Sequence, residues 1–156
     1  MPTVFINSPL GTTKIVGDEN GISQISILEE GVISKTIPNE LKLAVTQINE
    51  YFSGTRTDFD FRINPNGTNF QKKVWQELLN IPYGKTISYL DLAKKLGDPK
   101  VIRAAASANG KNPLWIVIPC HRVIGTDGSL TGYAGGFWRK KWLLEHESPT
   151  TQQSLF

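Results

Sequence analysis

The single cysteine of the chain, Cys120, is followed directly by a histidine and an arginine in the run Pro119-Cys120-His121-Arg122-Val123. A thiolate is a strong nucleophile, and a nearby cation or imidazole raises its population. Consecutive side chains of an extended chain point to opposite sides, so contact between Cys120 and His121 would need a bend at Pro119 or a bridging water. A lone cysteine is otherwise often a small buried apolar residue. The run therefore leaves two interpretations open, a nucleophile and a core side chain.

The first part of the chain, residues 1–66, is predicted to be largely β-structure followed by a helix. Apolar, β-branched runs are separated by turn clusters such as Asp18-Glu19-Asn20-Gly21. Apolar residues at helical spacing over 39–52, with Gly54 after them, predict one helix. The predicted strands cover residues 4–6, 12–16, 22–28 and 59–63.

The second part, residues 67–156, is predicted to be mostly helical. Capping boxes begin two of its helices, at Thr68 and at Ser88. A tight turn with Gly97 joins the second helix to the next one, which suggests helix-turn-helix geometry, although two helices joined in this way can also be simply packed. The other predicted elements are a helix over about 100–109, a buried strand over 115–118, a glycine-rich loop over 125–136 and a last helix ending near 147.

Charge is distributed unevenly over the two parts. Residues 1–66 carry 5 Lys/Arg and 8 Asp/Glu, a net charge of −3, whereas residues 67–156 carry 12 and 6, a net charge of +6. The excess favours a polyanionic partner for the second part, and a solvated basic face is the alternative. Arg103 is the only long side chain in a run of Ala and Ser. If a helix there binds DNA, it should do so with little sequence preference. The alternative is that its alanines pack in a core.

Composition excludes several classes of protein. One cysteine allows no disulfide within the chain and no cysteine-rich zinc site, so we expect no metal. The longest apolar run is far shorter than the roughly 20 residues of a membrane span, so no membrane association is expected. No secretory signal is visible, and a reducing cytoplasm is the expected location.

The run from Pro119 to Val123 resembles the active-site signature of the O6-alkylguanine-DNA alkyltransferases, also called methylated-DNA–protein-cysteine methyltransferases. Residues 68–147 resemble this family in the order and spacing of further motifs, and residues 1–66 resemble only its variable N-terminal lobe. These motifs are 70–79, Pro82-Tyr83-Gly84, Ser88-Tyr89, Arg103-Ala104, Asn109-Gly110, Asn112-Pro113, Gly132-Tyr133 and Trp142-Leu143-Leu144 with Glu147.

The resemblance implies an α+β fold with two lobes. Residues 1–66 would form a ribonuclease-H-like lobe with a small antiparallel sheet and a helix. Residues 67–156 would form a mostly helical lobe that binds DNA through a helix-turn-helix and accepts the alkyl group.

The resemblance also implies the catalytic roles. Cys120 would accept the alkyl group, and His121 would remove its proton through a water. Glu147 would hold the imidazole tautomer, a position that Glu145 matches less well. Tyr89 would donate a hydrogen bond to N3 of the departing guanine, and Asn112 would support the loop geometry.

DNA-binding roles follow from the same resemblance. Arg103 would enter the base stack in place of the flipped nucleotide, with Ala104, Ser107 and Tyr89 also facing DNA. The remaining implied contacts are Gln71 and Thr126 on the DNA backbone and Tyr133 and Ala134 in the base pocket.

The function predicted from the sequence is irreversible transfer of a methyl or other alkyl group from O6 of guanine in double-stranded DNA to Cys120. We expect a monomer that needs no cofactor, and activity on O4-alkylthymine stays open. The alternatives are a non-enzymatic sensor of alkylated DNA or a helix-turn-helix regulator, against which Cys120 argues. A Cys/His hydrolase is disfavoured because no oxyanion site is evident.

Overall fold

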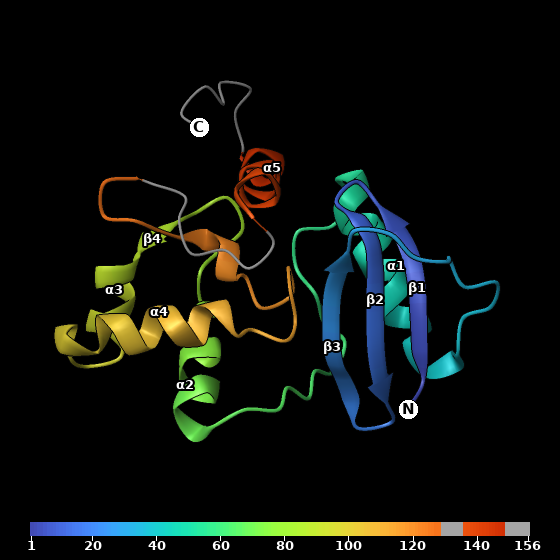
Figure 1. Ribbon diagram of the computed structural model, residues 1–156, viewed down its shortest axis with the longest axis horizontal. Coiled ribbons are helices and arrows are strands. Elements are labelled where there is room, and N and C mark those ends of the chain that lie inside the picture. The colour runs from blue at the N-terminus through green and yellow to red at the C-terminus, as the bar shows by residue number, and fades with distance from the viewer. Residues whose placement is uncertain (129–135, 149–156) are drawn as a thin grey trace. The chain divides into compact units, whose positions relative to one another are not determined.

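The structure is a computed structural model that describes residues 1–128 and 136–148 (Figure 1). It divides into two compact units, the first formed by residues 1–66 with 113–117 and the second by residues 67–112 with those from 118 onward. Residues 113–117, which the sequence groups with the second part, thus belong to the first unit. Within the described ranges, no helix is long and apolar enough to cross a membrane.

The first unit contains a three-stranded antiparallel sheet, as the sequence predicts. Its strands are β1 (Thr3–Ser8), β2 (Gly11–Asp18) and β3 (Gly21–Leu28), in the order β1-β2-β3. Both hairpins have two-residue loops, because Ser8 pairs with Gly11 and Asp18 pairs with Gly21. The two glycines have φ values of 128° and 130°, which other residues rarely adopt.

Helix α1 (Lys42–Ser53) lies against one face of this sheet and follows a 3-10 turn, η1 (Asn39–Leu41) (Figure 1). It ends as predicted at Gly54, whose φ of 85° allows its N–H to bond the carbonyl of Tyr51. The buried residues of α1 recur at helical spacing and meet alternate residues of the strands. The shared core contains Val4, Ile6, Ile15, Ile25, Leu41, Val45, Ile48 and Tyr51.

The strand predicted over residues 59–63 is wrong. Only Ile63 forms a bridge, to Ile22. The backbone N–H of Asp60 instead bonds the Oε1 atom of the buried Gln47 on α1, at 3.1 Å. The Gln47 side chain therefore accepts the backbone N–H of Asp60, which in a strand would bond the carbonyl of a neighbouring strand.

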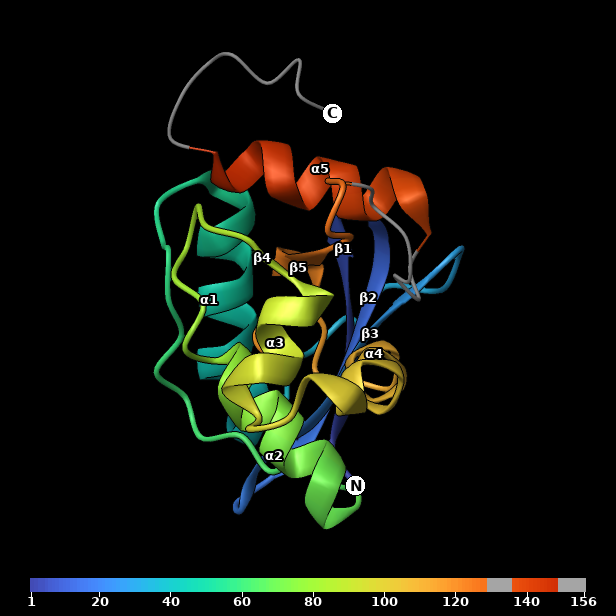
Figure 2. The same ribbon diagram turned by 90° about the vertical axis from the view of Figure 1, so that its left-hand side faces the viewer.

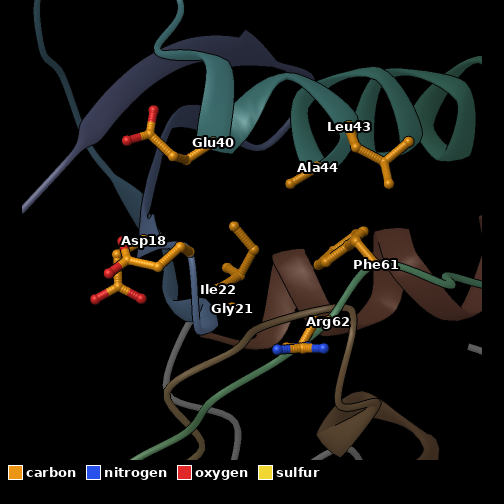
Figure 3. A pocket seen from close by; sticks show the side chains of 9 residues that line it. Asp18, Gly21, Ile22, Glu40, Leu43, Ala44, Phe61 and Arg62 are labelled. Carbon is orange, nitrogen blue, oxygen red and sulfur yellow. The ribbon is translucent and has the colours of Figure 1, made fainter.

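A pocket of the first unit lies between the β2–β3 hairpin, the start of α1 and the segment at residues 61–62 (Figure 3). Carboxylates of Asp18 and Glu40 stand on one side of it, and Leu43 and Phe61 stand on the other. None of the residues predicted from the sequence to act in the site lines this pocket.

The second unit is mostly helical. Its elements are α2 (Asn69–Leu78), β4 (Ile87–Ser88), α3 (Tyr89–Lys95), η2 (Pro99–Val101), α4 (Ile102–Gly110), η3 (Cys120–Arg122), β5 (Val123–Ile124) and α5 (Phe137–Glu147). The capping box predicted at Thr68 is confirmed, because Thr68 and Gln71 exchange two hydrogen bonds. Ser88 accepts the N–H of Asp91 and so caps α3, which is one of the two hydrogen bonds of the capping box predicted there.

Helices α3 and α4 form the predicted helix-turn-helix (Figure 2). Gly97 with φ 103° ends the first helix, and Asp98 caps the turn that leads into α4. On α4, Ala105 and Ala108 are buried while Arg103, Ala104 and Ser107 are exposed. The small residues of α4 thus occupy both its buried face and its exposed face, and the exposed face carries few long side chains.

The buried strand predicted over residues 115–118 is also wrong, although three of its four residues are buried. Val117 N–H bonds the Trp115 carbonyl at 2.8 Å, and Ile116 between them has φ 76°, the geometry of a γ-turn. Leu114 forms a bridge to Ile25 of β3, and the Trp115 N–H bonds the Ile25 carbonyl. The pairing with β3 does not continue beyond Trp115. An apolar run alone does not distinguish a strand from a buried turn.

Candidate active site

Cys120 begins the 3-10 turn η3 of the second unit and follows a second tight turn. Its N–H bonds the Ile118 carbonyl at 2.8 Å, and Pro119 between them has φ −80° and ψ 64°, an inverse γ-turn. Two asparagines from the end of α4 hold this segment. Asn112 Nδ2 donates to the Ile118 carbonyl at 2.7 Å, and Asn109 Nδ2 donates to the Cys120 carbonyl at 3.3 Å. The backbone around the thiol is therefore fixed from both sides.

The thiol of Cys120 is buried, with 4% of the residue exposed. Burial raises the pKa of this thiol to about 11, against the opposing effects of the Asn112 side chain, the Lys140 ammonium and the N–H groups of Cys120 and His121. The resting group at neutral pH is thus a protonated thiol, and its reaction as a nucleophile requires a base.

His121 and Glu147 form a buried pair. The His121 Nε2 atom lies 2.8 Å from Glu147 Oε2, and the two residues are 0% and 1% exposed. Arg122 holds the same carboxylate in bidentate fashion, with Nε at 2.7 Å from Oε1 and Nη2 at 2.9 Å from Oε2. Burial alone would raise the pKa of Glu147, but His121 and Arg122 outweigh it and hold that pKa well below its usual range.

The carboxylate determines which imidazole nitrogen carries the proton. An ionised Glu147 accepts only, so the Nε2 atom of His121 must be the donor, and in the neutral form of the imidazole Nδ1 is the nitrogen without a proton. His121 Nδ1 is buried and has no hydrogen-bond partner among the described residues. A general base is thus available one residue from the thiol. Glu145, the weaker candidate for the role of Glu147, is partly exposed, and its Oε1 atom lies 3.9 Å from Lys141 Nζ.

Tyr89 begins α3, directly after the short parallel pairing of β4 with β5. In this pairing Ile87 lies opposite Val123 and Ser88 opposite Ile124, so the backbone that follows η3 runs beside the start of α3. Burial raises the pKa of the Tyr89 phenol, the Cys120 thiolate raises it further, and a hydrogen bond from Asn109 lowers it. The sheet thereby brings a phenol near the thiol from a residue 31 positions earlier in the chain.

Lys140 is a further charged group at this site. It is 0% exposed, its Nζ atom donates to the Val123 carbonyl at 2.6 Å, and it lies 5.7 Å from the centre of the Tyr89 ring. Burial lowers the pKa of its ammonium to about 8, and the Cys120 thiolate acts in the opposite direction. Lys140 thus supplies positive charge to an otherwise enclosed site.

The structure brings together five of the residues that the sequence predicts to act in catalysis. Cys120, His121 and Glu147 meet through η3 and α5, and Tyr89 and Asn112 adjoin the thiol from α3 and the end of α4. The exposed face of α4 carries the other main group, Arg103, Ala104 and Ser107.

Gln71 and Thr126, the candidates for contact with the DNA backbone, lie on α2 and after β5. Gln71 uses its Oε1 atom in the capping box of α2, and Thr126 is exposed after β5. Tyr133 and Ala134, predicted to line a base pocket, lie outside the described residues. The part of the chain that the structure describes contains no group of three or more His, Cys, Asp or Glu side chains that could hold a metal ion.

Sequence reasoning missed three residues of the site. The resemblance assigns no role to Asn109, Arg122 or Lys140, yet all three are buried. Asn109 bonds the Cys120 carbonyl, Arg122 bonds the Glu147 carboxylate, and Lys140 bonds the carbonyl of Val123, three residues after the thiol. Helical spacing carried a signal for Lys140, because it falls in line with Leu143, Leu144 and Glu147 on one face of α5. Fold and site together define a helix-turn-helix protein with a buried thiol next to a general base.

Comparison with known proteins identifies the family. The model of the 6-O-methylguanine DNA methyltransferase DNA binding domain matches residues 69–149, and that of the ribonuclease-like domain matches residues 3–65. The chain therefore belongs to the 6-O-methylguanine DNA methyltransferase family, and its predicted α+β fold class is confirmed.

Individual relatives match over nearly their whole length. A Mycobacterium bovis protein named methylated-DNA--protein-cysteine methyltransferase is 45% identical, over 96% of this chain and 94% of the relative. A Methanosarcina barkeri protein of the same name is 43% identical, over 92% and 94%. The crystal structure of Mycobacterium tuberculosis OGT in complex with DNA superposes with a TM-score of 0.83 at 42% identity, covering 96% of each chain.

Proposed function

We propose that this protein repairs DNA by transferring a methyl or other alkyl group from O6 of guanine to the Sγ atom of Cys120. The observation that carries the proposal is the buried arrangement of Cys120, His121 and Glu147 in a helix-turn-helix unit. The names of the Mycobacterium bovis and Methanosarcina barkeri relatives, which describe transfer from methylated DNA to a protein cysteine, support it.

His121 is the base in this reaction. Glu147 fixes the tautomer, and the Nδ1 atom receives the Cys120 proton through a bridging water. The sulfur then forms a bond to the alkyl carbon while the carbon–O6 bond breaks, and the bonding electron pair goes to the guanine. The proton taken up by His121 returns to the guanine, so that the products are a neutral thioether and unmodified guanine.

Three polar or charged side chains assist the changes of charge during transfer. Asn112 hydrogen-bonds the developing thiolate, which opposes the effect of burial on its pKa. Tyr89 donates to N3 of the guanine as negative charge grows on the base. The positive charge of Lys140 stabilises the thiolate of Cys120.

Helix α4 presents the DNA-binding face. The alkyl carbon on O6 is buried in a base pair, so the nucleotide must leave the duplex before attack. Ala104 and Ser107 allow close approach to the minor groove, and Arg103 fills the gap in the stack. Gln71 and Thr126 contact the DNA backbone.

The partner is double-stranded DNA carrying O6-alkylguanine, and the protein acts as a monomer. The excess of positive charge in residues 67–156 supports a phosphate-contacting surface. The thioether formed on Cys120 is a poor leaving group for water or a second thiol. Each chain therefore repairs one lesion.

Intact-mass measurement after mixing with a duplex that contains O6-methylguanine tests the proposal. A gain of one methyl group per chain, located on Cys120 by peptide mapping, is the expected result. Cys120→Ser should bind the duplex yet gain nothing, because a neutral hydroxyl is a poor nucleophile. Methyl transfer by that variant, or a parent chain that binds the lesion without any mass change, would contradict the assignment; the second result would indicate a damage sensor.

A further inference from the structure

A guanidinium and an imidazole share one carboxylate oxygen in the second unit. The Nε2 atom of His121 lies 2.8 Å from Glu147 Oε2, and the Nη2 atom of Arg122 donates to the same oxygen at 2.9 Å. The imidazole residue is 0% exposed, the arginine 6% and the glutamate 1%. Solvent therefore does little to screen the permanent positive charge of Arg122 from the imidazole beside it.

Arg122 is held in this position by further contacts. Its Nη1 atom donates to the Ile81 carbonyl at 2.7 Å, and its guanidinium carbon lies 5.7 Å from the centre of the Tyr83 ring. The Tyr83 O–H in turn donates to the carbonyl of His146 on α5 at 3.2 Å. With Nε bonded to Glu147 Oε1 at 2.7 Å, the planar pairing also fixes the direction in which Oε2 faces the imidazole.

The charge on Glu147 balances only one of its two partners when the imidazole is protonated. A carboxylate by itself favours an imidazolium, and a second cation on the same oxygen opposes this effect. Burial raises the pKa of the two nearby phenols and of the thiol, so these groups are neutral at pH 7, and the remaining ammonium is a further cation. These groups are Tyr83, Tyr89, Cys120 and Lys140.

We propose that Arg122 is a positioning residue for the transfer reaction, which keeps His121 unprotonated before transfer by sharing the carboxylate oxygen that would otherwise stabilise an imidazolium. The inference rests on the function proposed above and adds a residue to it. A neutral imidazole can accept the Cys120 proton through water, and an imidazolium that faces a guanidinium gives this proton up more readily to the departing guanine. Arg122 acts through Glu147 and His121 and touches neither the thiol nor the base in this account.

An NMR titration of the imidazole signals tests the inference without alkylated DNA. The chain has two histidines, so His146 supplies the one other imidazole signal, and His146→Gln assigns both. Arg122→Met removes the charge and keeps an unbranched side chain. The His121 imidazole of this variant should lose its proton at a pH about one to two units higher than in the unaltered chain, whereas Arg122→Lys, which retains the charge, should titrate close to it.

Single-turnover alkylation of Cys120 by a saturating duplex with O6-methylguanine, followed from about pH 5.5 to about pH 9, gives the consequence for the reaction. Arg122→Met should be slower than the unaltered chain by about tenfold at the acidic end and by less than about threefold at the alkaline end, because more of its His121 carries a proton at low pH. Arg122→Lys should recover the pH dependence of the unaltered chain.

Arg139→Met is the matched control. Arg139 is a second buried arginine of this unit, and its guanidinium carbon lies 4.6 Å from the centre of the Trp138 ring. The substitution should leave the His121 titration and the shape of the pH profile unchanged. Arg122→Gln, which also removes the charge, takes the place of Arg122→Met if that variant does not fold.

The outcomes separate the inference from the function on which it rests. A His121 titration that is the same with and without Arg122, together with an equal loss of rate at every pH, would overturn the role of Arg122. An Arg122→Lys variant that behaves like Arg122→Met would overturn it as well, because charge would then not be the cause. Failure of the unaltered chain to methylate Cys120 would overturn the proposed function instead, while the NMR titration would still decide whether Arg122 controls the proton on His121.

Discussion

The Nε2 atom of His121 lies 2.8 Å from Glu147 Oε2, and neither side chain reaches solvent. The two residues are 26 positions apart, and the pairing forms only when α5 packs against η3. Because Arg122 binds the same carboxylate, Glu147 is the partner of a buried guanidinium as well as of the imidazole proposed to act as the base. Stability and reactivity can therefore be tested at one residue.

Glu147→Gln should lower the free energy of unfolding at pH 7 by about 3–5 kcal/mol, because it leaves the guanidinium of Arg122 buried without its partner. The pKa of Glu147 is held below its unfolded value, so its contribution is present above about pH 4.3 and is lost as the pH falls further. Denaturant titrations at pH 7 and pH 3.5 should give a smaller difference for the variant than for the parent chain.

Glu145→Gln is the matched control for that measurement. Glu145 is partly exposed and lies 3.9 Å from Lys141, so the substitution should change neither the stability nor its pH dependence. A similar loss in both variants would mean that the buried ion pair is not the cause.

The Cys120 thiol should react with iodoacetamide at a rate that keeps rising up to about pH 11, because burial raises its pKa to about that value. Lys140→Met should slow this reaction at pH 7 by about threefold to tenfold, since it removes a buried positive charge that favours the thiolate. Lys141→Met, one residue further and partly exposed, should leave the rate unchanged. A plateau below pH 9, or equal effects of the two variants, would contradict this account of the thiol.

Arg103→Ala should slow transfer from duplex DNA by roughly tenfold to a hundredfold, because the wedge offsets part of the few kcal/mol needed to extrude a base. Transfer from the free O6-alkylguanine base should change little, since no stack has to open. Arg103→Lys should recover only part of the rate because it lacks the planar group that can stack. Single-turnover alkylation by both substrates measures this, and equal losses would assign Arg103 to the fold or the pocket.

Binding to undamaged duplex should weaken steeply with salt and depend little on sequence, because we expect the exposed lysines of the second unit to contact phosphates. The exposed lysines of this unit include Lys72, Lys73, Lys94, Lys95, Lys100 and Lys111. Fluorescence anisotropy at several salt concentrations gives the slope. Affinity that is the same at low and moderate salt would argue against a phosphate-contacting surface.

The elements that the sequence predicts correctly are those specified by local rules. Strands β1 to β3 follow from apolar, β-branched runs between turn clusters, and α2 and α3 begin at the capping residues Thr68 and Ser88. The two errors, at 59–63 and 115–118, are apolar segments whose backbone partners are decided by distant residues such as Gln47 and Ile25. Periodicity describes a face to be buried and does not specify the hydrogen bonds made there.

Within the site, motif resemblance and geometry contribute differently. Cys120, His121 and Glu147 are found by resemblance, whereas Asn109 and Lys140 are polar residues on the buried faces of α4 and α5 and could have been noticed by their spacing. The pairing of Arg122 with Glu147 could not have been noticed in this way, because nothing in the local sequence indicates a partner 25 residues away.

The segment at residues 113–117 belongs to the first unit, where the Ile25 N–H bonds the Pro113 carbonyl and Trp115 bonds back to Ile25. A fragment that begins at residue 67 would keep the helix-turn-helix but remove β3 from beneath this segment. Leu114 and Ile116, which are buried, would then become exposed just before the turn that Ile118 forms with Cys120. The first 66 residues supply none of the residues proposed to act in catalysis, yet their strand β3 pairs with the segment that leads along the chain to Cys120.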